Sequence, residues 1–160
     1  MDNQGRLWLG GAYPNGYLQV YDPHIGLVRQ ITHLEITKID HIVIDGDVAF
    51  AVYIGTTSSD IGILKFDLDE AGLPEYQDYY TDFADETITE IRDLDIFQDS
   101  LYVITDQGIF VGNYKDNLKL SDKWVKIDDD DFADNSAMQF LPGSSPIILG
   151  DGSIFHREGG

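Results

Sequence analysis

The stretch ITKIDHIVIDGDVAFAVY, residues 36–53, can be laid over ITEIRDLDIFQDSLYVIT, residues 88–105, at an offset of 52 residues. Apolar residues match apolar ones along most of the alignment, and each copy divides into two strand-like runs around a short polar turn. Three further matches are Thr37 with Thr89, Asp47 with Asp99 and Phe50 with Tyr102. An internal repeat of this length, with several short strands in each copy, is typical of the blades of a β-propeller.

The residues around the two copies supply the further strands that four-stranded blades need. Turn-rich segments such as DGD, GTTSSD and DEAGLP separate the apolar runs, and no segment shows a sustained helical period. We expect blade remnants at residues 6–32, 36–81, 88–127 and 137–157, of which the first lacks its first strand and the last lacks its fourth. The sequence therefore predicts an all-β fold: a β-propeller segment of about three and a half four-stranded blades, forming a single partial domain over residues 1–160.

The second strand of each blade has the pattern of a buried strand. VAFAVYI, residues 48–54, has no polar break and alternates larger side chains with Ala49 and Ala51, as expected for a strand covered on both faces. We expect equivalent core positions in the second strand of every blade. These positions are Trp8, Phe50, Tyr102 and Ile147.

The charge and composition exclude several partners. The 160 residues carry 29 acidic and 10 basic side chains, a formal net charge of −19, which repels nucleic acid and anionic membrane surfaces. No apolar run approaches the roughly 18 residues of a membrane span, so we expect no membrane insertion. The absence of cysteine removes disulfides and thiolate chemistry.

Two stretches carry a resemblance to known propeller families. DNQGRLWLGG, residues 2–11, followed by GYLQVYDP, residues 16–23, resembles the two-component regulator propeller repeat. Residues 99–127 resemble blades of the N-terminal propeller of PorZ-type proteins from type IX secretion systems. The resemblance implies a propeller fold, and because the repeat residues are structural in those families, it transfers no catalytic residue.

We expect a non-catalytic binding or assembly module: a β-propeller fragment of a larger bacterial envelope or sensor protein that recognises a protein partner or an envelope glycan. The sequence assigns neither catalytic nor ligand-binding residues. The alternative is a carbohydrate-active propeller enzyme, sialidase-like or a polysaccharide lyase. Such an enzyme needs an arginine-rich or His/Tyr-centred pocket, and arginine occurs only at positions 6, 29, 92 and 157. No Gly-x-Ser-x-Gly elbow is present.

Acidic clusters raise the question of a metal site. KIDDDDFADNS, residues 126–136, places Asp128, Asp130 and Asp131 close together, but it lacks the alternating acids, the glycine and the final glutamate of a calcium loop. We interpret it as a solvated loop between blades, with calcium as the alternative, and expect no cofactor. DLDEAGLPEYQD, residues 67–78, comes nearer to that spacing, yet Ala71 fills a ligand position, which favours a hairpin turn.

Two other features have both a functional and a structural interpretation. His41 lies on an inner strand, which lines the channel of a propeller, and Asp40 or Asp45 would orient its ring. We favour a structural or exposed histidine. An aromatic group on an outer strand, whose members are Tyr76, Tyr79, Tyr80 and Phe83, could stack on sugars or pack on a neighbouring strand.

The N-terminal residues and the incomplete end blades lead to two further expectations. Residues 1–4 have neither the basic nor the apolar region of a secretory signal. We expect the periplasm or the cell surface, as part of a longer exported protein, with the cytoplasm as the alternative. Blades that lack a strand expose edges and apolar faces, which predicts that the isolated chain self-associates through its terminal blades.

Overall fold

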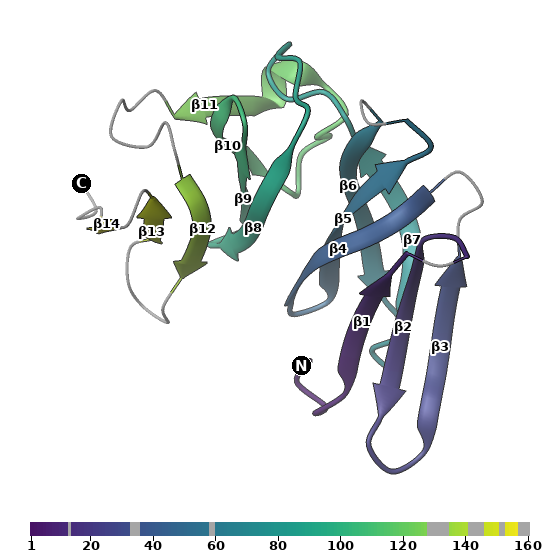
Figure 1. Ribbon diagram of the computed structural model, residues 1–160. Coiled ribbons are helices and arrows are strands. Elements are labelled where there is room, and N and C mark those ends of the chain that lie inside the picture. Colours follow the sequence, from purple (N-terminus) through teal and green to yellow (C-terminus); the bar gives the residue numbers. More distant parts are fainter. Residues whose placement is uncertain are drawn as a thin grey trace. The chain divides into compact units, whose positions relative to one another are not determined.

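The computed structural model describes residues 1–12, 14–32, 36–57 and 60–127, together with the backbone of three strands at 135–140, 146–150 and 153–156 (Figure 1). The chain divides into two compact units, residues 1–81 and 82–160. The single partial domain expected over residues 1–160, with its four blade remnants, stays a prediction.

Unit 1 contains two antiparallel sheets in which neighbours in the chain are neighbours in the sheet. The first sheet consists of β1 (Leu7–Gly11), β2 (Tyr17–Asp22) and β3 (Gly26–Thr32). The second consists of β4 (Ile36–Asp45), β5 (Val48–Gly55), β6 (Ile61–Leu68) and β7 (Pro74–Tyr80).

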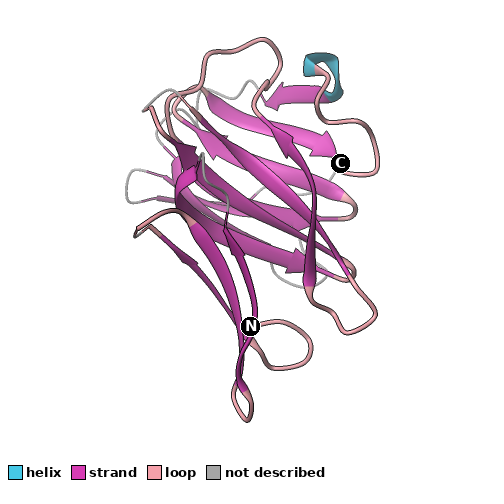
Figure 2. Cartoon of the chain, turned by 90° about the vertical axis from the view of Figure 1, so that its right-hand side faces the viewer, coloured by secondary structure: helices cyan, strands magenta, loops and turns pink. Residues whose placement is uncertain are grey.

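Unit 2 repeats this meander. One sheet is formed by β8 (Ile91–Phe97), β9 (Ser100–Thr105), β10 (Gly108–Asn113) and β11 (Trp124–Ile127), and the other by β12 (Asn135–Phe140), β13 (Pro146–Gly150) and β14 (Ser153–His156). Among the described residues the helical structure is the short 3₁₀ turn η1 (Ser121–Lys123), and Figure 2 shows strands, turns and loops elsewhere. The predicted all-β class is confirmed.

The two copies of the repeat form hairpins of matching register. Val43 lies opposite Phe50 in the β4–β5 hairpin, and Asp95 lies opposite Tyr102 in the β8–β9 hairpin, so both pairs are separated by the offset of 52 residues. A β-bulge interrupts β4 at His41 and β8 at Arg92, within one residue of the equivalent place. Both copies therefore form two antiparallel strands around a turn, as the repeat predicts, but β8 begins at Ile91, three residues later than the start of β4 at Ile36 would give at this offset.

The core of unit 1 lies between its two sheets. Leu18 from β2 packs with Ile39 from β4 and with Ala49 and Ala51 from β5, and Trp8 packs against this cluster from β1. The opposite face of β5 is also buried, since Phe50 is 0% exposed. Strand β5 is therefore covered on both faces, as its unbroken apolar sequence predicts.

Two of the expected core aromatics are not fully buried, which corrects the sequence prediction. Trp8 is half-buried because it lies on β1, the edge strand of its sheet, and its indole N–H donates to the Asp2 carboxylate at 2.9 Å. Tyr102 is also half-buried and lies opposite Asp95, a polar cross-strand neighbour. The side chain of Ile147 lies outside the described residues.

Candidate binding site

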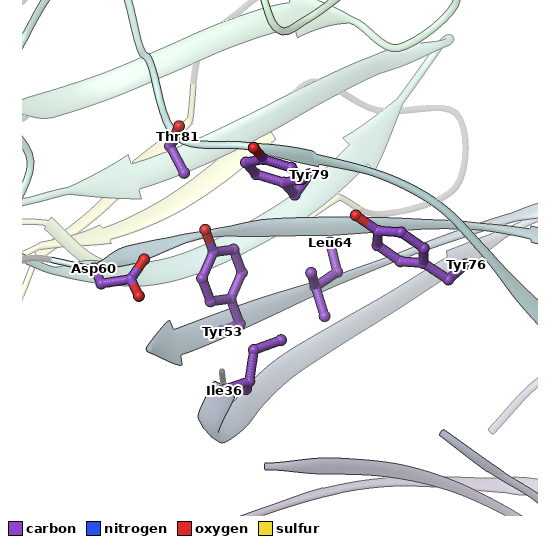
Figure 3. A pocket seen from close by; sticks show the side chains of 7 residues that line it. All are labelled: Ile36, Tyr53, Asp60, Leu64, Tyr76, Tyr79 and Thr81. Atoms are coloured by element: carbon purple, nitrogen blue, oxygen red, sulfur yellow. The ribbon is translucent and has the colours of Figure 1, made fainter. Parts of the chain in front are cut away.

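Three tyrosines and one carboxylate surround a pocket on unit 1. The pocket has a volume of about 290 Å³, and Figure 3 shows its lining side chains, with Asp60 beside Tyr53 at one end of the view and Tyr76 at the other. The lining residues come from β4 to β7 and from the segments that follow β5 and β7. They are Ile36, Tyr53, Asp60, Leu64, Tyr76, Tyr79 and Thr81.

A bulge in the outer strand places two of the tyrosines on the same face of the sheet. Tyr76 and Tyr79 are three residues apart, and regular alternation would point them to opposite faces. In the β6–β7 pairing, Lys65 lies opposite Asp78 and Phe66 lies opposite Tyr76, so Gln77 is the extra residue. The bulge reverses the alternation once, and both rings line the pocket.

The pocket has a buried floor and an accessible rim. Ile36, Tyr53 and Leu64 belong to the core cluster of unit 1. Tyr76 and Tyr79 are 45% and 46% exposed, respectively. The Tyr76 ring meets the buried Phe66 ring edge-on at 6.3 Å between centroids, a contact that holds the ring in place. The pocket therefore presents aromatic surface that a ligand can reach.

The Asp60 carboxylate enters the pocket where a glycine leaves room for it. The Gly55 amide donates to the Asp60 carbonyl at 2.6 Å, and the Asp60 amide donates to the Thr57 carbonyl at 3.1 Å, so these bonds hold Asp60 against the end of β5. A Cβ atom on Gly55 would lie 1.7 Å from an Asp60 carboxylate oxygen. No other residue type at position 55 allows this approach.

The electrostatics of the pocket are negative. Burial, followed by the negative charge of Asp60 and the nearby Tyr79 and Tyr76, raises the pKa of Tyr53 to about 12. The Tyr53 hydroxyl is therefore protonated at neutral pH. None of the described residues that line the pocket is a lysine, arginine or histidine.

The structure divides the aromatic group that the sequence singled out. Tyr76 and Tyr79 line the pocket, whereas Tyr80 is 3% exposed and buried in the sheet. Phe83 is fully buried in unit 2, where its ring lies 4.8 Å from that of Trp124. The sequence analysis missed Tyr53 and Asp60. The Gly55 that ends an otherwise apolar strand was the available signal for a close approach.

Residues 67–78 form the β6–β7 hairpin, and two arginines contact its turn. Asp69 accepts the amides of Ala71 and Leu73 at 2.9 and 2.8 Å and pairs with Arg29 at 3.1 Å. The Arg6 guanidinium donates to the carbonyls of Ala71 and Gly72 at 2.9 and 2.5 Å. The hairpin interpretation is confirmed.

The opening motif has a structural role. Arg6 and Asp2 form a buried ion pair at 2.7 Å, and the same carboxylate accepts the Trp8 indole N–H. Partial burial raises the pKa of Asp2, but hydrogen bonds from Trp8, Arg6 and Gln4 lower it more, so the net shift is downward. Through Arg6, the start of the first sheet is joined to the hairpin of the second.

The remaining candidates do not form a site in the described part of the chain. His41 is exposed at the β4 bulge, with φ of 30°, and Asp40 accepts its amide at 3.2 Å and pairs with Lys38. Within residues 1–12, 14–32, 36–57 and 60–127, no group of three or more acidic or histidine side chains is arranged to hold a metal ion. Asp128, Asp130 and Asp131 lie outside the described residues, and calcium binding there stays a prediction.

The chain is similar in fold to part of one characterised protein. It aligns with a structure of PorZ, described as an essential bacterial surface component of the type IX secretion system of Porphyromonas gingivalis, with a TM-score of 0.59 and 12% identity. The alignment covers 99% of this chain and 26% of the PorZ chain. The alignment supports the PorZ-like fold suggested by residues 99–127, and it does not support the resemblance to the two-component regulator repeat.

Comparisons of the sequence itself give no further relative. No family model matches the chain, and no curated protein matches it. The helical structure of the described residues is limited to the three residues of η1, which is far too short to span a membrane.

Proposed function

We propose that this chain is a non-catalytic binding or assembly module at the bacterial cell surface, built as part of a β-propeller, and that the tyrosine pocket is its recognition site for a protein partner. The observation that carries the proposal is the pocket itself: exposed aromatic rings over a buried floor, with one carboxylate. The fold similarity to PorZ supports a place in secretion machinery of the cell envelope.

The propeller part of the proposal has two supports. The repeat gives two four-stranded antiparallel meanders whose first hairpins have the same register. In unit 1, two meanders pack face to face around a shared core, as neighbouring blades do. Rigid sheets of this kind position loops and strand ends for recognition.

The pocket chemistry favours binding over catalysis. Hydrolysis of a glycoside uses two carboxyl groups on either side of the scissile bond. Among the described residues that line this pocket, Asp60 is the single carboxylate and none is a serine. The carbohydrate-active enzyme is therefore the weaker alternative. A glycan remains the second candidate ligand, because sugars stack on exposed aromatic rings such as Tyr76 and Tyr79.

Site-specific photo-crosslinking tests the proposed function. A benzophenone amino acid replaces Tyr79 in the pocket or, as a matched control, Leu120, the residue before η1, which is 48% exposed against 46% for Tyr79. In cells that export the chain, we expect a discrete protein adduct from position 79 that disappears when Tyr76 is also changed to Ala. Equal labelling from positions 79 and 120, or an adduct at position 79 that persists after Tyr76→Ala, would contradict a recognition role for the pocket.

Self-association is a separate part of the proposal. Leu7, Tyr21 and Leu27 lie side by side across β1, β2 and β3, and both leucines are close to half exposed. These residues form an apolar row on the first sheet, which supports association of the isolated chain. We expect light scattering to show a concentration-dependent dimer or larger species, and the double substitution Leu7→Lys and Leu27→Lys to abolish it. A monomer at all concentrations would contradict this part.

A further inference from the structure

We propose that the tyrosine pocket binds the cationic end of a lysine or arginine side chain presented by the partner protein. The inference rests on the proposed function and names the chemistry of the group that the site recognises. It follows from the aromatic lining, from the position of Asp60, and from the charge of the surrounding chain.

The aromatic lining provides the first part of a cation site. The face of a tyrosine ring carries a negative quadrupole, which attracts an ammonium or guanidinium group placed over it. Three tyrosines line one pocket, and Figure 3 shows the Tyr79 ring above the row that runs from Tyr53 to Tyr76. The volume of about 290 Å³ admits the end of one long side chain.

The carboxylate provides the second part. Asp60 enters the pocket at the Tyr53 end, where backbone hydrogen bonds to Gly55 and Thr57 fix its position. A carboxylate next to aromatic faces combines an ion pair with cation–π attraction. One carboxylate suits a monovalent organic cation. A calcium ion needs six to eight oxygen ligands, which this lining does not offer.

Among the described residues of unit 1, no lysine or arginine side chain fills the pocket. Arg6 pairs with Asp2, Arg29 with Asp69, and Lys38 with Asp40. Lys65 is next to Leu64 in β6 and so points to the opposite face of the sheet. The described lining therefore has no basic group of its own, and a basic partner completes it.

The charge of the whole chain favours the same occupant. A net charge of −19 attracts basic partners and repels phosphorylated or sulfated ligands. A neutral sugar gains nothing from this field. Complementary charge also speeds association, so binding of a basic partner weakens as salt concentration rises.

Matched small probes test the inference on the full chain. Choline and 3,3-dimethylbutanol have nearly the same shape but differ in charge, and titration is followed by NMR chemical shifts or calorimetry. We expect choline to bind about tenfold more tightly than 3,3-dimethylbutanol. N-acetyl-lysine methylamide and N-acetyl-arginine methylamide are compared in the same way, and the tighter of the two identifies the side chain.

Variants assign the binding to the pocket. Asp60→Asn removes the carboxylate charge at constant shape and is expected to weaken choline binding at least about fivefold. Asp45→Asn makes the same charge change at the exposed end of β4 and is the matched control, with no expected effect. Tyr79→Phe keeps an aromatic face and should retain binding, whereas Tyr79→Leu should lose it. Unchanged melting temperatures show that each variant is folded.

Each other outcome overturns the inference. Equal binding of choline and its neutral analogue would show a merely apolar pocket. If an oligosaccharide binds through Tyr79 while choline and the lysine and arginine amides do not bind, the ligand of the pocket is a glycan and not a cation. If no probe binds but position 79 still crosslinks a partner, the recognition site stands and its cationic occupant is wrong. If position 79 also fails to crosslink, the proposed function fails with it.

Discussion

The sheet of β4–β7 and the sheet of β8–β11 start alike and then diverge. Their first hairpins share a register at an offset of 52 residues, but the next connection differs. Five residues, 56–60, join β5 to β6, whereas Asp106 and Gln107 alone join β9 to β10. The counterpart of Tyr53 at that offset is Thr105, whose hydroxyl donates to the Gly108 carbonyl at 2.9 Å. The longer loop and one aromatic residue make the difference between a tight turn and a pocket.

The repeat also places a threonine hydrogen bond at the open end of each hairpin, away from its turn. The Thr37 hydroxyl donates to the carbonyls of Ile54 and Gly55 at 3.1 and 2.8 Å. Its counterpart Thr89 donates its hydroxyl to the carboxylate of Asp106 at 2.7 Å, and Asp106 occupies the position equivalent to Ile54. The threonine therefore bonds at the equivalent place in both hairpins, but its partner in the second hairpin is a titratable carboxylate, Asp106.

The largest expected difference between the two hairpins comes from their matched aromatics. Phe50→Ala removes a fully buried ring and should lower the free energy of unfolding by about 3–5 kcal/mol. Tyr102→Ala removes a half-buried ring and should cost about 1–2 kcal/mol. Urea denaturation measures both. Equal losses would mean that the two positions are not distinguished by burial.

The second prediction concerns pH, because the β8–β9 hairpin contains a carboxyl group at a position where the β4–β5 hairpin has none. Partial burial raises the pKa of Asp106, but hydrogen bonds from Thr89, Gln107 and the Glu90 amide lower it from 3.8 to about 2. Because the folded pKa lies below the unfolded one, this contribution to stability is present above about pH 4 and is lost as the pH falls toward 2. We expect the protection factors of the Thr89 and Glu90 amides, which are exchange rates corrected for the intrinsic effect of pH, to fall over that interval.

The variant Asp106→Asn tests the cause. It should remove the pH dependence of the protection factors at these two amides, and protection in the β4–β5 hairpin should be unaffected by the substitution. An unchanged pH profile in Asp106→Asn would assign the effect to another carboxyl group.

Thr37→Val should have a smaller effect that does not depend on the titration of a partner. It removes hydroxyl bonds to two backbone carbonyls and is expected to cost about 1 kcal/mol at any pH between 4 and 8. Denaturation at several pH values checks this. A loss that grows with acidity would indicate that a carboxyl group also takes part in closing the first hairpin.

The sequence predicted the parts of the fold that follow from periodicity. The 52-residue offset carried the register of both hairpins, because a shift by one residue would turn the apolar face of each strand outward. The unbroken apolar run at 48–54 indicated a strand buried on both faces. Ala49 and Phe50, on opposite faces, are both 0% exposed, which confirms it.

The pocket could be predicted only in part. Alternation places Tyr76 and Tyr79 on opposite faces, and the bulge at Gln77 that brings them together has no sequence pattern of its own. Asp60 reaches Tyr53 through loop closure, and Arg6 reaches the β6–β7 hairpin through its long side chain. These contacts depend on the three-dimensional arrangement and not on local periodicity.

The smallest expected effect concerns the two bulges. His41 has a φ of 30°, which costs free energy for any residue with a Cβ, whereas Arg92 at the second bulge does not have a positive φ. His41→Gly should therefore change stability by less than about 0.5 kcal/mol, because relief of strain offsets the added chain entropy. Arg92→Gly should lose about 1 kcal/mol. Thermal unfolding of the two variants provides the comparison.

The most direct test of the central claim, that the first copy of the repeat carries the recognition site and the second does not, is a chemical shift map of the full chain with choline. We predict shifts that saturate together at Tyr53, Asp60, Tyr79 and Thr81, with no change around Thr105 and Gln107 in the second copy. Saturable shifts in both copies, or shifts that avoid the tyrosine pocket, would contradict the claim.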